Sequence, residues 1–277
     1  MMTEHDAQAG CSSPIGGSRE KTSLTVIKVG GAIVEDEERL ALLLRDFSAI
    51  KGQKVLVHGG GRRATKVATS LGIETKMMNG RRITDKDMLE VVPMVYGGLV
   101  NKNIVARLQA VGVNALGLTG ADMDVIRSHR RPLKEGVDYG FVGDVEHADG
   151  KALQTLIEAG VTPVMAPLTH DGQGHILNTN ADTIASETAK ALAAYYDVTL
   201  IYSFEKKGVL SNPDDDDSVI PVITRADFDR YVANRTVAGG MIPKLENALA
   251  AIDAGVSRVI ITLATALDGK HGTVIKD

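Results

Sequence analysis

The sequence predicts an α/β protein built on an open, mainly parallel, twisted sheet with helices on both faces. From Leu24 onward, short runs rich in β-branched residues alternate with amphipathic stretches that have the period of a helix. Strands that alternate with helices favour a parallel sheet, because each crossover places a helix against one face. A chain of 277 residues suits one large domain or two modest ones.

In the first half of the chain, we predict strands over residues 24–29, 54–58, 115–118, 141–145 and 161–166. Helices are predicted over 40–50, from the glycines at 59–61 to about 71, and over 151–159. Thr84 and Asp87 have the spacing of a capping box, which predicts a long helix from there towards Leu108.

In the second half, Asp171-Gly172 predicts the turn of a β-hairpin. A helix over 181–194 and a strand over 198–202 follow, then a polar loop at 212–217. Thr224 and Asp227 predict the start of a short helix, and Pro243 suits the first turn of another. The last predicted strands cover 257–262 and 273–275. A boundary between the two halves of the chain, without an obvious linker, is predicted near 168–176.

Composition excludes several classes of function. The net charge of −4 gives no overall attraction to phosphate polymers, so nucleic acid is not expected as a partner. No apolar run approaches the roughly 20 residues of a membrane helix, and no membrane partner is expected. The single cysteine, Cys11, cannot form an intrachain disulfide. Residues 1–22 are polar and aperiodic, which predicts a flexible tail without a signal peptide. We expect a cytoplasmic enzyme.

Two glycine clusters directly follow predicted strands, where ligands bind in sheets of this kind. Lys28 precedes Gly30-Gly31, and glycines there let backbone amides approach an anion. His58 precedes Gly59-Gly60-Gly61 at the start of a helix, whose amides attract carboxylate or phosphate. Each cluster also fits a simple strand-to-helix turn, and His58 fits a structural residue.

Further residues suit an anionic ligand. Arg81 and Arg82 lie where a dinucleotide site would need an acid, although a solvated loop explains most arginine pairs. Lys244 follows glycines at 239–240 in the first turn of a helix, where it opposes the helix dipole unless an anion binds. A helix cap explains one polar residue of 178–182, but not all of Asn178, Asn180 and Asp182. P-loop and zinc-site spacings are missing, and we assign no metal ligand.

Five motifs in order give the chain a resemblance to the amino acid kinase family, from Leu24 to Ile275. They are Lys28-Val-Gly-Gly31, His58-Gly-Gly-Gly61, Asn79-Gly-x-Arg82-x-Thr84, Asn178-x-Asn-Ala-Asp182 and Gly240-Met-x-x-Lys244. The motifs at 79–84 and 178–182 resemble those of the members that phosphorylate the γ-carboxylate of N-acetyl-L-glutamate in arginine biosynthesis. The resemblance implies the amino acid kinase fold and a phosphotransferase that uses ATP with Mg²⁺.

The resemblance also implies roles for individual residues. Lys28 and Lys244 would stabilise the transferring phosphoryl group, and Asp182 would hold both lysines. The acylated glutamate would be bound by four residues: Gly59, Gly60, Arg82 and Asn178. Gly30 and Gly31, with the two lysines, would lie against the phosphates of ATP. Residues 23–170 would form the half that binds acyl-glutamate and dimerises, and 171–277 the half that binds ATP.

Departures from the family pattern leave alternatives open. The segment 203–208 is one residue longer than the family's usual segment, and Arg81 replaces a residue that is commonly apolar. An extra arginine suits a second carboxylate, so N-succinylglutamate is a hypothetical substrate. Three competing hypotheses remain: a family member with another acceptor, a nicotinamide-dependent oxidoreductase, and a non-catalytic metabolite sensor. The tail lacks the amphipathic helix of arginine-inhibited hexamers, so we expect an arginine-insensitive homodimer.

Overall fold

The structure is a computed structural model that describes residues 21–78, 81–133, 136–239, 241–267 and 269–277. The predicted flexible tail, apart from its last two residues, lies outside the described residues. The same is true of Asn79, Gly80 and Gly240 from the motifs. Nowhere in the described ranges is a helix both long and apolar enough to cross a membrane.

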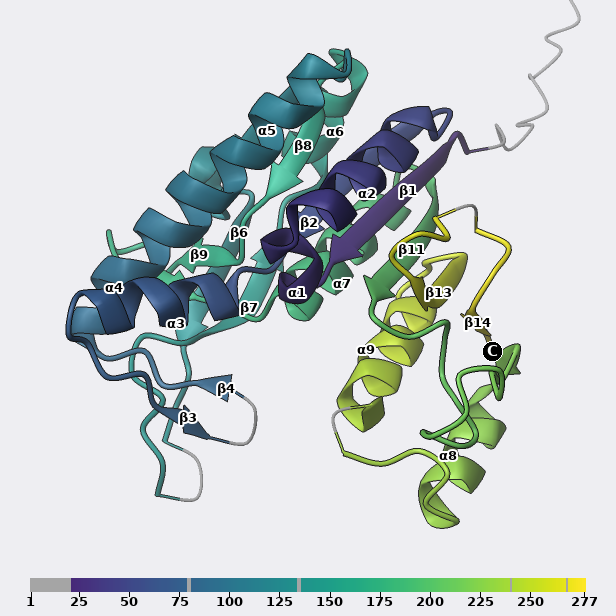
Figure 1. Ribbon diagram of the computed structural model, residues 1–277. Helices are drawn as coiled ribbons and strands as arrows, with labels where there is room; N and C mark the ends of the chain where they lie inside the picture. The colour runs from purple at the N-terminus through teal and green to yellow at the C-terminus, as the bar shows by residue number, and fades with distance from the viewer. Residues whose placement is uncertain (1–20, 79–80, 134–135, 240, 268) are drawn as a thin grey trace, which may run out of the picture.

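An eight-stranded sheet forms the centre of the molecule (Figure 1). Its strands lie in the order β12 (Val222–Ile223), β14 (Thr273–Ile275), β13 (Arg258–Leu263), β11 (Asp197–Phe204), β1 (Ser23–Val29), β2 (Gln53–His58), β8 (Thr162–Met165) and β5 (Ala115–Leu118). Neighbouring strands are parallel except β13 and β14. The predicted mainly parallel sheet is therefore confirmed, with β1 at its centre.

Helices cover both faces of this sheet, because β1 carries apolar side chains that must be buried on both of its faces. Leu24 and Val26 point into one hydrophobic cluster, and Ile27 and Val29 point into the other. The first cluster packs against α6 (Gly150–Glu158), α7 (Ala181–Ala193), α8 (Arg225–Ala233) and α9 (Met241–Asp253). The second packs against α1 (Gly31–Glu35), α2 (Glu37–Ala49), α3 (Gly61–Ser70), α4 (Lys86–Val92), the π-helix η1 (Pro93–Val100) and α5 (Asn101–Ala110).

Two smaller sheets lie outside the central one. The first has the order β10 (Ile176–Asn178), β9 (Leu168–His170), β6 (Ile126–Arg130) and β7 (Gly143–Ala148). The second is the hairpin of β3 (Met77–Met78) and β4 (Arg81–Arg82), which projects away from the central sheet (Figure 1). A short 3₁₀ turn, η2 (Asp122–Asp124), precedes β6.

Several local predictions are confirmed and others are wrong. The hairpin predicted at Asp171-Gly172 joins β9 to β10. The strand predicted over 141–145 forms two residues later, as β7. The capping box predicted at Thr84 and Asp87 is wrong, because the Asp85 carboxylate caps α4 by accepting from the Met88 amide at 3.0 Å. Thr84 is instead fully buried, with its backbone paired to the segment that ends at Phe141.

Candidate active site

The glycines after β1 and β2 pack directly against each other. β1 and β2 are neighbours, so Gly30 and Gly59 leave the sheet side by side. The Gly59 amide donates to Val29 O at 3.0 Å, and the Gly30 amide donates to Ser203 O at 3.3 Å. A Cβ on Gly59 would lie 3.1 Å from the Gly31 amide nitrogen. A side chain at position 59 would therefore push these two loops apart by a few tenths of an ångström, so glycine favours their close approach.

Gly60 forms one wall of a cavity of about 190 Å³. A Cβ at this position would lie 2.9 Å from Cδ1 of Tyr96, a buried ring on the π-helix η1. A π-helix turn often marks a functional site, and here it places Tyr96 under the glycine loop. The other lining residues include Met77, Arg81, Arg82, Val142, Pro167, Asn178 and Thr179.

Arg82 is held in place beside this cavity. Its guanidinium donates to Gly61 O at 2.7 Å and to Thr65 Oγ1 at 2.9 Å from one nitrogen. The other terminal nitrogen contacts Thr75 Oγ1 at 3.3 Å. Only 9% of Arg82 is exposed. A buried guanidinium with neutral partners offers its charge to an anionic ligand in the cavity.

Asn178 reaches the cavity from the end of β10. Its Nδ2 donates to Thr84 Oγ1 at 2.8 Å, and both residues are buried. Thr84 therefore fixes the orientation of the Asn178 amide. The helix cap is a different residue, Asn180, whose side chain accepts from the amides of Asp182 and Thr183. The polar residues of this motif therefore have different roles: Asn180 caps α7, whereas Asn178 and Asp182 contribute to the site.

Asp182, in the first turn of α7, binds two lysines from different parts of the chain. Lys28 Nζ, at the end of β1, lies 2.7 Å from Asp182 Oδ1. Lys244 Nζ, in the first turn of α9, lies 2.5 Å from Oδ2. The three side chains are between 12% and 24% exposed. Both carboxylate oxygens are therefore used to hold two ammonium groups together.

Electrostatics make Asp182 a permanent anion. Burial opposes ionisation of its carboxyl, but the charges and hydrogen bonds of Lys28 and Lys244 outweigh burial and lower its pKa to about 2. Burial lowers the pKa of Lys28, with Asp182 opposing and Lys244 adding to the shift. A carboxyl with a pKa near 2 is a poor proton acceptor at neutral pH. With both lysines protonated, the cluster carries a net positive charge.

A second cavity, of about 260 Å³, lies at the start of α9, on the Lys244 side of the cluster. Its lining includes Lys206, Gly208, Pro213, Arg235 and Met241. Lys206 pairs with Asp216 at 2.6 Å, so part of the acidic run at 214–217 is neutralised by the unusual segment 203–208. Across the described ranges, no group of three or more His, Cys, Asp or Glu side chains is arranged to hold a metal.

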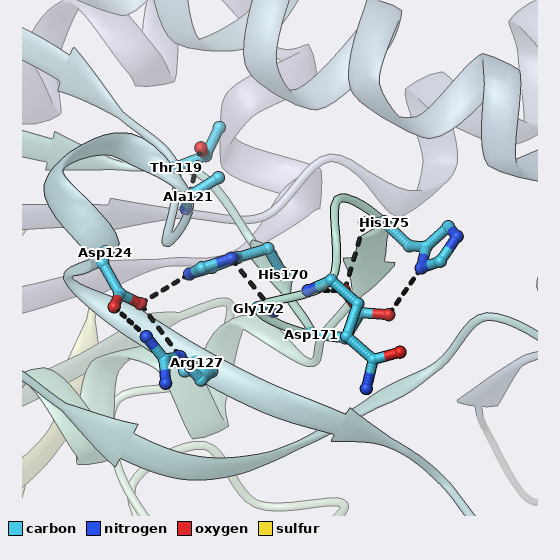
Figure 2. Close-up of polar contacts among 9 residues, drawn as sticks. Thr119, Ala121, Asp124, Arg127, His170, Asp171, Gly172 and His175 are labelled. Atoms are coloured by element: carbon cyan, nitrogen blue, oxygen red, sulfur yellow. Dashed lines mark hydrogen bonds and ion pairs between the residues drawn. The ribbon is translucent and has the colours of Figure 1, made fainter.

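Polar contacts surround the turn between β9 and β10, the strand that ends at Asn178 (Figure 2). His170 Nε2 lies 2.7 Å from Asp124 Oδ1, and Asp124 also pairs with Arg127 of β6. In the hairpin turn, His175 Nδ1 lies 2.7 Å from Asp171 Oδ2. The contacts of Asp124 with His170 and Arg127 link the hairpin to β6, whereas the His175–Asp171 pair lies within the turn; none of these side chains lines the cavity.

The structure brings the predicted site residues into two adjoining groups. Gly59, Gly60, Arg82 and Asn178 line the smaller cavity. The ion-paired cluster joins that cavity through α7, because Asp182 directly follows the lining residue Ala181. Gly31 packs against the backbone of the second glycine loop, and Gly30 precedes it directly after β1.

Sequence reasoning missed other residues of the site. Tyr96 gave no motif signal. Thr84 belongs to the family motif at 79–84, but the only role predicted for it was that of a helix cap. Tyr96 lies in an apolar segment, where a tyrosine is most often a core residue. Only the spatial arrangement could identify it as part of the site.

Comparison with known proteins agrees with the residue pattern. The model of the amino acid kinase family matches residues 23–263. The acetylglutamate kinase of Bacteroides thetaiotaomicron is 71% identical over 258 residues, which cover 93% of this chain and 99% of the relative. That of Bacteroides fragilis is 70% identical over 256 residues, covering 92% and 98%. The crystal structure of smu.665 from Streptococcus mutans is 31% identical with a TM-score of 0.76, covering 91% and 98%.

Proposed function

The chain belongs to the amino acid kinase family, and we propose that it transfers the γ-phosphoryl group of ATP to the γ-carboxylate of N-acetyl-L-glutamate in arginine biosynthesis. The observation that carries the proposal is the Asp182 carboxylate, which holds Lys28 and Lys244 together beside a cavity lined by Arg82 and glycines. The high identity to acetylglutamate kinases over nearly the whole chain supports the same acceptor.

The chemistry explains why the site contains cations and amides and uses no base. A free γ-carboxylate has a pKa of about 4.3, so it is ionised and nucleophilic at neutral pH. Its oxygen forms a bond to the γ-phosphorus while the bond from phosphorus to the ADP oxygen breaks. The main obstacle is repulsion between two anions, and positive charge aligned on the transferring group reduces it.

Lys28 and Lys244 are the groups that supply this charge in the proposal. Each lysine contacts one oxygen of Asp182, and an ammonium group has three N–H donors with which to bind anionic oxygens. Asp182 acts as the organiser of the two lysines. Its pKa of about 2 supports this role over that of a general base.

The acylated glutamate is proposed to occupy the cavity of about 190 Å³. Arg82 and Asn178 would bind its polar groups, and the amides at Gly59 and Gly60 would face the reacting carboxylate and phosphoryl oxygens. The buried position of Arg82 and the fixed amide of Asn178 support these roles, because little reorganisation is needed when the ligand binds.

ATP is proposed to bind with its base in the cavity of about 260 Å³ and its phosphates towards Gly30, Gly31 and the two lysines. Mg²⁺ is expected to arrive as MgATP. Both oxygens of Asp182 contact lysines, which fits a metal held mainly by phosphates and water. When bound, the ion would neutralise charge on the phosphates. In this proposal residues 23–170 supply most of the acceptor site and residues 171–277 most of the nucleotide site, and the exceptions are Asn178 and the Lys28–Gly31 segment.

The test is release of ADP from purified protein with MgATP, with acyl phosphate trapped by hydroxylamine. N-Acetylglutamate, N-succinylglutamate and free glutamate are compared in parallel. Turnover with an acylated glutamate and none with free glutamate supports the proposal. Folded protein that binds ATP but phosphorylates none of the three refutes it, and would favour a different acceptor or a metabolite sensor.

One observation favours N-succinylglutamate as a second candidate acceptor. Arg81 lines the cavity, half-buried, and burial followed by the charge of Arg131 lowers its pKa. Arg131 pairs with Asp144, and the charge of the same carboxylate only partly offsets these effects on Arg81. A second carboxylate on the acyl group would balance the excess of positive charge from the two arginines. A clear preference of the enzyme for the acetyl substrate, unchanged in Arg81→Met, would reject the idea.

We also propose a cytoplasmic homodimer that arginine does not inhibit. Large apolar side chains are exposed on η1 and on the edge strand β5: Met94 is 55% exposed, and Leu99 and Leu116 are each 39% exposed. Such a surface suits a partner copy. Light scattering should give twice the mass of the chain, and Met94→Glu should shift it towards the monomer. A hexameric mass together with inhibition by arginine would contradict the proposal.

A further inference from the structure

A buried series of polar contacts runs behind the peptide that joins Gly59 to Gly60. His58 is fully buried, with Nδ1 2.9 Å from Gly59 O and Nε2 3.1 Å from Asn101 Nδ2. The same Asn101 nitrogen donates to Val164 O at 2.9 Å. Because a carbonyl oxygen only accepts, Nδ1 carries the imidazole proton, and Nε2 accepts from the amide of Asn101.

The surroundings of Asn101 are shaped around this contact. A Cβ on Gly117 would lie only 1.7 Å from Asn101 Oδ1, so glycine is required there. Within the described residues, Asn101 Oδ1 is buried and has no hydrogen-bond partner. An unpaired buried oxygen costs stability and calls for an explanation. The explanation offered by the geometry is that both protons of the amide are in use, one on Val164 and one on His58.

We propose that His58 and Asn101 are positioning residues that hold the Gly59 carbonyl towards the core and thereby aim the Gly60 N–H into the acceptor cavity. The inference rests on the proposed function. In a trans peptide the C=O and N–H point in opposite directions, and the described residues contain no cis bond. Gly60 lines the cavity, and its amide has no hydrogen-bond acceptor in the part of the chain that the structure describes.

The protonation state of His58 suits this task. Burial lowers the pKa of its imidazole to about 4, so the ring is neutral at pH 7 and keeps one tautomer throughout the assay range. A donor that is fixed before the reaction is most effective where negative charge develops in the transition state. Misdirecting that donor should therefore lower kcat and leave ATP binding unchanged.

Two substitutions of similar polarity separate the two contacts of His58. In His58→Asn, the side-chain amide occupies the position of Nδ1 and can still donate to Gly59 O. In His58→Gln, the amide reaches the position of Nε2, keeps a partner for Asn101 and loses the contact with Gly59. We expect kcat to fall about tenfold or more in His58→Gln and to stay within about threefold of wild type in His58→Asn. The KM for ATP should stay unchanged in both.

A structural role alone would affect the two variants equally or in the reverse order, and either result would overturn the proposal. Gly117→Ala provides an independent variant if a His58 variant fails to fold, because its Cβ would displace Asn101 without entering the cavity. It should lower kcat in the same direction, and normal kcat with Asn101 displaced would contradict the proposal.

NMR distinguishes failure of this inference from failure of the proposed function, because it needs no substrate. In wild type, ¹⁵N spectra should show the neutral Nδ1–H tautomer of His58. The Gly60 amide resonance should shift in His58→Gln and remain in place in His58→Asn. If wild type phosphorylates no acylated glutamate, the proposed function fails, and these spectra still decide the positioning role. A different tautomer, or an unmoved Gly60 amide in His58→Gln, refutes it.

Discussion

Lys244→Ala is the substitution whose effect follows most directly from the structure. It removes one of the two ammonium groups on Asp182 and leaves Lys28 at 2.7 Å, so a buried ion pair survives and the fold should persist. The transferring phosphoryl group loses one preorganised cation. Losing a comparable donor costs about 10²–10³-fold in kcat, or about 3–4 kcal/mol of activation free energy. We expect Lys28→Ala to lower kcat by a similar factor.

The assay is ADP release under saturating MgATP and acylated glutamate, with the KM of each substrate measured separately. The KM for the acyl substrate should change by less than about threefold, because Lys244 does not line its cavity. Lys190→Ala is the matched control, since Lys190 pairs with Glu187 on α7, away from Asp182. Near-normal kcat in folded Lys244→Ala protein would refute the role given to this lysine.

The remaining predictions concern the residues around this pair. Thr84→Val removes the acceptor that orients Asn178, so the KM for the acylated glutamate should rise about fivefold to tenfold with kcat within about threefold; an unchanged KM would contradict the orientation. Gly60→Ala places a Cβ 2.9 Å from the Tyr96 ring, and kcat/KM should fall by about 100-fold, whereas wild-type kcat/KM would show that the loop can move freely. The Asp182 carboxyl has a folded pKa of about 2, below its ordinary value of 3.8. Its stabilisation is therefore fully present above about pH 4 and is lost as the pH falls through 2. Denaturant titrations should show that wild type loses about 2 kcal/mol more unfolding free energy over this range than Asp182→Asn, and parallel losses would exclude the ion pair as the source.

Much of the fold was predictable because local pattern and tertiary environment agree. The strands β1, β2 and β8 are apolar and central, so burial on both faces matches their composition. Prediction was weaker in the small sheet. The strand β6, Ile126-Arg-Ser-His-Arg130, was not predicted. It is partly exposed, and its charged residues lack the apolar pattern of a buried strand. Its partner β7 was predicted two residues early, because the apolar side chain of Val142 precedes the strand.

The residues of the site were also predictable to different degrees. Lys28, Asp182 and Lys244 are ionisable residues next to glycines or a helix start, so residue type and position marked them as candidates, and the family resemblance implied their roles. Thr84 was assigned to a helix cap because its distance to Asp87 fits a capping box, and the neighbouring Asp85 took that role. The partner of Thr84 is Asn178, which is 94 residues away, and no local pattern carries that information.

Isotope transfer tests the central claim, that the γ-carboxylate attacks ATP, most directly. N-Acetylglutamate labelled with ¹⁸O in its γ-carboxylate is incubated with enzyme, MgATP and hydroxylamine, and the released phosphate is examined by ³¹P NMR. Hydroxylamine attacks the acyl carbon, so the bridging oxygen leaves with the phosphate. We predict one ¹⁸O atom in each phosphate formed from the trapped acyl phosphate. ADP formation with unlabelled phosphate would mean that water attacks ATP, which would contradict the proposed acceptor.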